Sequence, residues 1–298
     1  MKILLLGKNG QLGWELQRSL SVLGTLVALD RSESNNLCGD LTQLSKLRQT
    51  IQLIKPDIIV NAAAYTAVDA AESDKDKAFL INHLAPKLIA EEAQKLNALF
   101  IHYSTDYVFN GEGKAPWYES DKTDPLNIYG QSKLAGEQAI IASNCRYLIF
   151  RTSWVYAAKG NNFAKTMLKL AKDKTELSII SDQVGAPTSA ELLADVTAQV
   201  ITKSVNMTDY SGIYHVVASG ETTWFDYANF VFKVAAEKGV NLSLTNVKPI
   251  TTSEYPTPAE RPLNSKLNTQ KLCNTFSLTL PNWKQGVERM LTEIIIKE

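Results

Sequence analysis

The 298-residue chain is poor in cysteine and histidine and has no excess of either charge, and these shortages exclude several classes of protein. Its three cysteines, Cys38, Cys145 and Cys273, lie far apart and form no C-x-x-C pair, so we expect reduced thiols rather than a disulfide framework. Lysine plus arginine equals aspartate plus glutamate, 31 each, so no net field recruits nucleic acid or an anionic membrane. We therefore expect no nucleic-acid partner.

Long apolar runs are also missing from the sequence. None approaches the roughly 18 residues of a membrane span. The apolar segment after Met1 and Lys2, Ile3–Leu6, is too short for the core of a signal peptide. We therefore expect a cytoplasmic protein with no membrane partner.

A glycine-rich turn follows that first apolar run. Ile3–Leu6 predicts a parallel strand buried on both faces, and helical periodicity begins at Trp14. Between them, Gly7 permits a tight turn, Gly10 lets a pyrophosphate approach the backbone, and Gly13 lets the helix pack on the strand. The helix N-terminus supplies N–H groups and a positive dipole end. This context favours dinucleotide binding over a glycine turn without a ligand.

The next predicted strand, Thr25–Leu29, ends where a dinucleotide fold reads the adenosine ribose. Asp30 at that end is suited to the ribose hydroxyls of NADH, whereas Arg31 and Lys8 are suited to the 2′-phosphate of NADPH. Both signals are present, so the sequence leaves NADPH and NADH open. The segment Gly39–Leu41 is either an adenine contact or a plain turn.

Strands and helices alternate along the first half of the chain. Further strands are predicted at Ile58–Val60, Leu99–Tyr103 and Tyr147–Phe150, with helical segments between them. The fold class is therefore α/β, a doubly wound parallel sheet of the Rossmann type with right-handed crossovers. Ligands of such sheets bind at the carboxyl ends of the strands, where Asn61–Thr66 and Ser104–Asp106 follow.

Composition and rhythm change after about residue 155. We expect a dinucleotide-binding domain at 1–155 and a smaller α/β domain at 156–298 that mainly binds the substrate. Elements near 190–220 are candidates to rejoin the first domain. The polar segment Pro249–Asn268 is predicted to be a functional loop. Arg261 within it is either a phosphate clamp or a solvated arginine.

A tyrosine and a lysine spaced four residues apart carry the chemistry that we expect. If Tyr129–Lys133 is helical, the phenol of Tyr129 and the ammonium of Lys133 project from the same face. A nearby ammonium favours the phenolate and lowers the pKa of the phenol toward the working range. Thr105 could hold the phenol in line. Taken alone, the pair is more often a solvated helix face.

Long motifs in the same order extend this pattern over essentially the whole chain. The chain resembles the extended short-chain dehydrogenase/reductases, and within them the dTDP-4-dehydrorhamnose reductase family. The matching motifs are Gly7–Gly13, His102–Phe109, Arg151–Tyr156, Gly185–Thr188 and Arg261–Asn268. The resemblance implies NADPH- or NADH-dependent reduction of the C4 keto group of a dTDP-sugar. This is the last step of dTDP-L-rhamnose synthesis, which feeds bacterial surface polysaccharides.

The resemblance also implies a role for each matching residue. Tyr129 is the general acid, Lys133 lowers its pKa and binds the nicotinamide ribose, and Thr105 tunes the phenol and touches the sugar. The predicted cofactor-binding residues are Gly7, Gly10, Gln11, Leu12, Gly13, Asp30, Arg31, Asp40, Leu41, Ala63, Ala64, Tyr65, Tyr129 and Lys133. The predicted substrate-binding residues are Thr105, Asp106 and Trp154, with Asn162 and Arg261 as looser candidates for the diphosphate.

A magnesium-bridged homodimer is a further implication of the resemblance. Glu15, Glu191 and Glu293 fall in the matching motifs, although three scattered glutamates are more often plain surface residues. The histidines offer no alternative metal site, because His83, His102 and His215 show no ligand spacing.

Two other functions stay open from the sequence. Another sugar-nucleotide enzyme on this scaffold, an epimerase or dehydratase, would use the cofactor only transiently. The dehydratase is disfavoured, because Thr105 is followed by Asp106 and Tyr107 rather than by an Asp-Glu pair. A non-catalytic dinucleotide-binding regulatory subunit would keep the fold without turnover, and the intact set of Thr105, Tyr129 and Lys133 argues against it.

Overall fold

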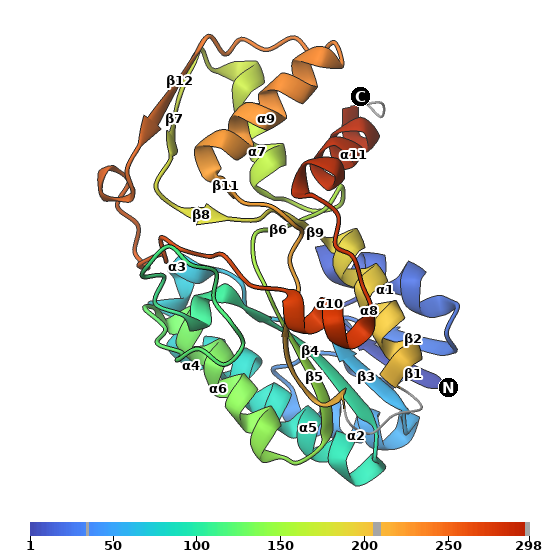
Figure 1. Cartoon of the computed structure of the whole chain (residues 1–298). Coiled ribbons are helices and arrows are strands. Elements are labelled where there is room, and N and C mark those ends of the chain that lie inside the picture. Colours follow the sequence, from blue (N-terminus) through green and yellow to red (C-terminus); the bar gives the residue numbers. More distant parts are fainter. Residues whose placement is uncertain (34–35, 205–209, 296–298) are drawn as a thin grey trace.

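A parallel sheet lies at the centre of the structure, a computed structural model that describes residues 1–33, 36–204 and 210–295 (Figure 1). Within these residues the sheet has six strands in the order β10-β5-β4-β3-β1-β2. Their bounds are β1 Lys2–Leu6, β2 Thr25–Leu29, β3 Ile58–Asn61, β4 Leu99–Thr105, β5 Arg146–Thr152 and β10 Gly212–His215. The order reverses between β1 and β3, as predicted for a doubly wound α/β fold.

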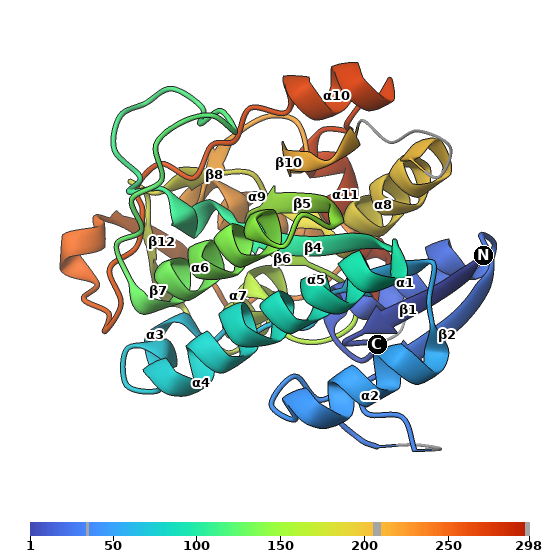
Figure 2. The same ribbon diagram turned by 90° about the horizontal axis from the view of Figure 1, so that it is seen from below.

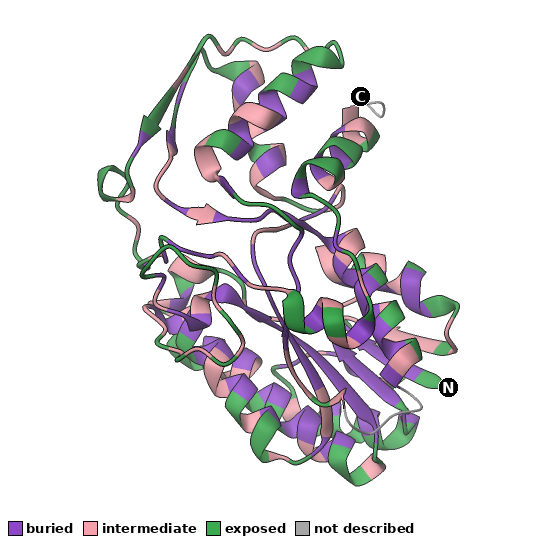
Figure 3. Cartoon of the chain, viewed as in Figure 1, coloured by how far each residue is buried: buried purple, intermediate pink, exposed green. Residues whose placement is uncertain are grey.

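Helices cover both faces of the sheet, as Figures 1 and 2 show. One face carries α2 (Leu44–Ile54), α5 (Ala85–Leu96) and α6 (Ile128–Ala142). The other carries α1 (Gln11–Ser21), α8 (Ala190–Ser204) and α10 (Gln270–Phe276). These layers bury the inner strands β1, β3, β4 and β5 over most of their length, whereas the edge strands β2 and β10 are less buried (Figure 3).

Side chains of one strand alternate between two apolar cores. On β1, Ile3 and Leu5 pack with the core that contains α1 and α8, whereas Leu4 and Leu6 pack with the core that contains α2 and α5. All four side chains are fully buried, which explains the continuous apolar run in the sequence.

A second layered unit lies above the carboxyl ends of the strands (Figure 1). Its helices are α7 (Phe163–Asp173), α9 (Trp224–Glu237) and α11 (Trp283–Ile295), and its ribbon pairs β7 (Glu176–Ile180) with β12 (Asn246–Ile250). Tyr227, Val231 and Trp283 lie in its apolar core. Since α8 and β10 belong to the central layers, the chain returns to them after residue 155. The division into domains at that residue stays a prediction.

Short elements connect the two units. β6 (Val155–Tyr156) pairs with β9 (Thr188–Ser189), and β8 (Val184–Gly185) pairs with β11 (Thr222–Thr223). On the central unit, α3 (Val68–Ala71), α4 (Lys75–Phe79) and a π-helical turn at Leu80–Leu84 lead into α5. No helix in the described ranges is long and apolar enough to cross a membrane.

Helix α6 is fixed to the sheet by a buried ion pair. Arg151 on β5 donates from Nη2 to Oε2 of Glu137 at 2.6 Å and from Nε to Oε1 at 3.0 Å. The residue before Glu137, Gly136, packs on the main-chain carbonyl of Asn82, and a Cβ there would overlap that oxygen. Charge and close packing together set the position of α6, which carries the predicted acid.

Candidate active site

The glycine turn has the geometry expected of a phosphate cradle. Gly7 has φ +88°, and a Cβ on it would lie 2.8 Å from the main-chain nitrogen of Ala63. A Cβ on Gly13 would overlap the Gly7 carbonyl oxygen, so this glycine lets α1 lie against β1. A Cβ on Gly10 would meet nothing closer than 3.5 Å. Gly7 and Gly13 therefore serve packing, whereas Gly10 leaves space above the N-terminus of α1.

Helix α1 begins earlier than the periodicity predicts. Gly10 is its N-cap residue and Gln11 its first helical residue, three positions before Trp14. Leu12 packs partly against the core, so the first turn is held as part of the helix. The free N–H groups of this turn point to the carboxyl edge of the sheet, where an anion is favoured.

Asp30 ends β2 in contact with the glycine turn. Its carboxylate accepts hydrogen bonds from Ser32 N at 2.8 Å and Asn9 Nδ2 at 2.5 Å, and Lys8 Nζ lies 3.6 Å away. The Ser32 N–H, followed by the Lys8 charge and the Asn9 amide, lowers the pKa of Asp30. Asp30 and Lys8 therefore both lie at the end of β2, where the 2′-hydroxyl of the adenosine ribose of a dinucleotide would be expected.

Asp40 forms a local turn. Its carboxylate accepts from the main-chain N–H of Thr42 at 2.9 Å and from the Thr42 hydroxyl at 2.8 Å. Burial raises the pKa of Asp40, but these hydrogen bonds outweigh it and the net shift is downward, with a smaller contribution from the Arg31 charge. Arg31 thus lies within electrostatic reach of Asp40, and Leu41 is buried in the core below.

The loop after β3 is held by an asparagine that the sequence did not single out. Asn82 Oδ1 accepts from Tyr65 N at 2.9 Å, and its Nδ2 donates to Tyr65 O at 3.0 Å and to Ser132 Oγ at 3.0 Å. This buried side chain ties the Ala63–Tyr65 segment to α6. The contacts span 17 and 50 residues, so no local pattern could have shown them.

Thr105 and Tyr129 meet at the carboxyl end of β4. Asn127 caps α6 by accepting from Gly130 N at 2.8 Å, which places Tyr129 in the first turn of the helix. The Thr105 hydroxyl lies within hydrogen-bonding reach of the Tyr129 phenol and also donates to Asp106 Oδ1 at 3.1 Å. The structure therefore brings together the threonine and the tyrosine that the sequence predicted.

The pKa of Tyr129 differs from the sequence-based expectation. Burial raises the pKa of Tyr129 to about 12, and the hydrogen bond with Thr105 only partly opposes that rise. The Lys133 amine is directed elsewhere, because it donates to the carbonyl oxygen of Tyr103 at 2.5 Å and lies 3.3 Å from Nε2 of His102. The protein alone thus keeps the phenol protonated.

Asp106 is a second buried titrating group in the site. Burial raises the pKa of its carboxyl to about 6, although Ser265 and Thr105 oppose the rise. Its Oδ2 has no hydrogen-bond partner among the described residues, and neither have the hydroxyls of Ser104 and Thr152. Three buried polar atoms at the ends of β4 and β5 thus lack a hydrogen-bond partner. A polar ligand bound there would be expected to supply those hydrogen bonds.

Trp154 lies between the two units in a strained conformation. Its φ is +48°, and its indole stacks on Trp224 with ring centroids 3.6 Å apart. Gly185 also packs against the indole, where a Cβ would lie 2.7 Å from Cε2. A non-glycine residue held at positive φ points to a functional constraint.

Asn162 connects the second unit to the glycine turn. Its Oδ1 accepts from Lys165 N at 3.2 Å and so caps α7, while its Nδ2 donates to Ala157 O at 2.7 Å and to Gln11 Oε1 at 3.1 Å. Asn162, which the sequence analysis predicted to bind the diphosphate, thus forms a hydrogen bond with the first residue of α1.

Arg261 is neither solvated nor free. It forms a bidentate ion pair with Asp69, from Nη1 to Oδ1 at 2.9 Å and from Nη2 to Oδ2 at 2.7 Å. Its Nη1 also donates to Ala259 O at 2.9 Å. Asn127 Nδ2 donates to the neighbouring Glu260 carbonyl at 2.7 Å, so this loop packs beside the start of α6. A role as phosphate clamp would require Arg261 to share its charge with Asp69.

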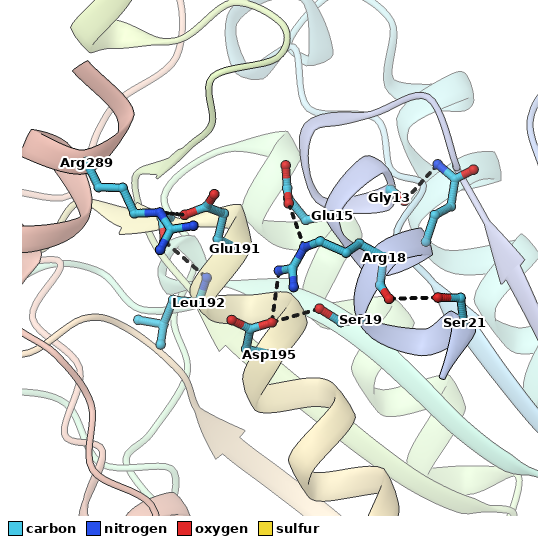
Figure 4. Close-up of polar contacts among 11 residues, drawn as sticks. Gly13, Glu15, Arg18, Ser19, Ser21, Glu191, Leu192, Asp195 and Arg289 are labelled. Atoms are coloured by element: carbon cyan, nitrogen blue, oxygen red, sulfur yellow. Dashed lines mark hydrogen bonds and ion pairs between the residues drawn. The ribbon is translucent and has the colours of Figure 1, made fainter. Parts of the chain in front are cut away.

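The three predicted magnesium ligands come from three helices, and Figure 4 shows two of them, Glu15 and Glu191. Burial raises the pKa of Glu15 on α1. The negative charges of Glu191 on α8 and Glu293 on α11 raise it further. Arg18 lies 3.6 Å from Glu15, and Arg289 lies 3.3 Å from Glu191. Within the described ranges no three side chains are grouped so that they could hold a metal ion. The predicted magnesium site therefore does not fit the residues of a single chain.

Comparison with known proteins gives one family over nearly the whole length. The family model described as RmlD substrate binding domain matches residues 1–296. The dTDP-4-dehydrorhamnose reductase of Escherichia coli (strain K12) is 56% identical over 99% of this chain and 98% of its own length. A crystal structure of dTDP-4-dehydrorhamnose reductase from Bacillus anthracis in complex with NADP has a TM-score of 0.86 at 36% identity, covering 98% of this chain and 99% of that chain.

A more distant structural neighbour shares only the fold. The UDP-glucose 4-epimerase of Thermus thermophilus, in complex with NAD, has a TM-score of 0.80 at 17% identity, covering 99% of both chains. The same scaffold therefore carries more than one activity, and the residues of the site have to discriminate between them.

Gly10 and Gly13 give a matched test of the cradle. We expect Gly10→Ala to weaken NADPH binding while leaving the free energy of unfolding near that of the wild type, since its Cβ meets nothing closer than 3.5 Å. Gly13→Ala should instead destabilise the fold, by about 1–3 kcal/mol as overpacked sites do. Fluorescence titration and urea unfolding measure the two effects. Equal loss of stability in both variants would contradict the division of roles.

Proposed function

The chain belongs to the RmlD family of dTDP-4-dehydrorhamnose reductases and reduces dTDP-4-dehydrorhamnose to dTDP-L-rhamnose, and we propose the residues through which it does so. The observation that carries the proposal is the meeting of Thr105 with a Tyr129 phenol whose pKa is raised by burial. A reduction needs an acid that still holds its proton when the carbonyl oxygen gains charge. The high pKa supports that role for Tyr129.

In the proposed mechanism, the C4 oxygen of the sugar is protonated as a hydride is added to C4. The reduced nicotinamide supplies the hydride to C4 of the sugar. Tyr129 donates its phenolic proton to the C4 oxygen as negative charge develops there, and the Thr105 hydroxyl orients the phenol. The buried Asp106 carboxylate and its unpartnered Oδ2 support a contact with a sugar hydroxyl. The stacked Trp154 ring supports a face for the sugar nucleotide.

The two alternative functions are weaker on the same residues. An epimerase on this scaffold shares 17% identity with the chain, whereas named reductases share up to 56%. A binding subunit without turnover has no need for a threonine hydroxyl within reach of a tyrosine phenol at the strand end. No contact or distance in the site favours either alternative over the reductase.

We propose NADPH or NADH as the cofactor, and two observations favour NADPH. The relative from Bacillus anthracis was solved with NADP. In this chain Lys8 and Arg31 lie at the Asp30 end of the site, where they could bind a 2′-phosphate. The three cysteines are free, which supports a reducing, cytoplasmic setting.

The role of Tyr129 is tested by removing one oxygen atom. Tyr129→Phe should lower kcat by about 10²- to 10⁴-fold, the usual contribution of general acid catalysis, with NADPH affinity nearly unchanged. NADPH oxidation with dTDP-4-dehydrorhamnose gives the rate, and fluorescence titration gives the affinity. Tyr118→Phe, on an exposed residue, is the matched control. Turnover within threefold of the wild type in Tyr129→Phe would refute the assignment.

The cofactor proposal is tested at Lys8. Lys8→Ala removes a partly exposed cation, so we expect KM for NADPH to rise about two- to fivefold, in line with an exposed ion pair, and KM for NADH to change less. Steady-state kinetics with both cofactors measures the ratio. An equal change for both would remove Lys8 from recognition of the 2′-phosphate.

A homodimer held by magnesium requires a second copy to complete the site. The charges of Glu191 and Glu293, which act on Glu15, support such an interface. The pairing of Glu15 with Arg18 and of Glu191 with Arg289 argues against a metal in the monomer. Light scattering with size-exclusion chromatography tests it. A dimer that dissociates in EDTA and re-forms with Mg²⁺ is the expected result, and a monomer under both conditions would contradict it.

A further inference from the structure

A short segment between the two units carries a buried serine, Ser265. On one side of the segment, Asn264 N donates at 3.0 Å to Gly111 O, in the loop that follows β4. On the other side, Ser265 N donates to Val184 O at 2.8 Å, and Val184 N donates to Leu263 O at 2.8 Å. Hydrogen bonds from both sides therefore fix the main chain at Ser265.

The side chain of Ser265 reaches the end of β4. Its hydroxyl lies within hydrogen-bonding reach of the Asp106 carboxylate, and both residues are at most 4% exposed. Thr105 donates to Asp106 Oδ1 at 3.1 Å, whereas Oδ2 has no hydrogen-bond partner among the described residues. Because a carboxylate only accepts, both hydroxyls donate their proton to it. Asp106 is thus held by the residue before it in the chain and by one from a distant segment.

Hydrogen bonds keep this carboxyl ionised against the effect of burial. Burial raises the pKa of Asp106 to about 6. The contribution that opposes burial most is the hydrogen bond from Ser265, and the one from Thr105 follows. The distant hydroxyl therefore has more effect on the ionisation of Asp106 than its neighbour in the chain has.

The titratable and charged groups around Asp106 add little net charge. The phenols of Tyr107, in the same turn, and of Tyr129, on α6, interact with Asp106. Burial raises the pKa of both phenols, so they are neutral where Asp106 titrates. Arg261 and Asp69 act on Tyr107, but they form an ion pair at 2.7 Å and their charges oppose each other. The two hydroxyls are thus the main contacts that stabilise the ionised carboxyl.

We propose that Ser265 is a positioning residue for Asp106: its hydroxyl holds the ionised carboxylate so that Oδ2 stays free to accept a hydrogen bond from a hydroxyl of the sugar. This inference rests on the sugar contact of Asp106 that the proposed function includes. It extends that contact to the segment that joins the two units. The attachment of the second unit and the acceptor for the sugar then depend on one serine.

The ionised form matters because of the strength of the bond to the sugar. A hydrogen bond to a carboxylate is roughly twice as strong as one between neutral groups. Use of the sugar should therefore decline as Asp106 takes up a proton. Removal of the Ser265 hydroxyl takes a stabilising contact from the ionised form, so the pKa of Asp106 rises and the decline begins at a higher pH.

Carbon NMR of the aspartate side chains tests the first step without turnover. In protein labelled with ¹³C at the aspartate Cγ, Asp106→Asn assigns the signal. Ser265→Ala should raise the pKa of Asp106 by about one unit, the effect of one hydrogen bond to a charged group. Ser265→Cys fills the same space with a weak donor, and a rise is expected there too if the alanine variant is unstable. A folded Ser265 variant with an unchanged pKa would overturn the proposal.

Ser204→Ala is the matched control. It also removes a buried hydroxyl, which donates to Val200 O at 2.8 Å at the end of α8. We expect the pKa of Asp106 to stay at its wild-type value in this variant. Equal increases in Ser204→Ala and Ser265→Ala would show that any lost hydroxyl has this effect, which would overturn the role of Ser265.

The pH dependence of kcat/KM for the sugar tests the second step. With NADPH saturating, we expect the acid limb for Ser265→Ala to move to higher pH by the same amount as the pKa measured by NMR. On the plateau above that limb, kcat should stay close to that of the wild type, because Tyr129 is untouched. An acid limb that stays in place although the pKa of Asp106 has moved would overturn the proposal.

Failure of this inference and failure of the proposed function give different results. If Tyr129→Phe kept its turnover, the proposed acid would be wrong, while the pKa of Asp106 in the Ser265 variants would still be measured in the absence of turnover. If Tyr129→Phe lost its turnover and the pKa of Asp106 did not move, only the role of Ser265 would be refuted.

Discussion

The placement of helix α6 is the constraint on which the site depends. The Glu137–Arg151 pair has all but a few per cent of its surface buried, and removing one partner of such a pair usually costs about 3–5 kcal/mol. Gly136 adds a contact with Asn82 that no larger residue permits. Because Tyr129 and Lys133 stand on this helix, the sheet fixes where the acid is and leaves little freedom to reorient it.

Burial, more than charge, sets the acid–base properties of the site. It raises the pKa of Tyr129 to about 12 and of Asp106 to about 6, and it lowers that of Lys133 to about 8. All three shifts favour the uncharged form, which is the general effect of a medium of low dielectric constant. A reductase benefits from this setting because negative charge on the carbonyl oxygen is disfavoured there, which favours transfer of the proton that Tyr129 still holds.

The sequence predicted the features that repeat locally and missed those that depend on distant partners. The alternating strands, the glycine turn and the spacing of Tyr129 and Lys133 follow from short-range rules, and the structure has them. The capping of α6 by Asn127 and the pairing of Arg261 with Asp69, 192 residues apart, do not. Lys133 was expected to face Tyr129 because of its spacing, but a carbonyl on the adjacent strand offers a better hydrogen bond.

A hydrogen bond between the side chains of Gln11 and Asn162 joins the two units beside the glycine turn. Gln11 starts the helix under the phosphate cradle, and Asn162 caps the first helix of the second unit. A ligand that changes the free energy of this contact from the cofactor side changes it equally for a ligand on the sugar side. The order of binding would then affect the path but not the total free energy.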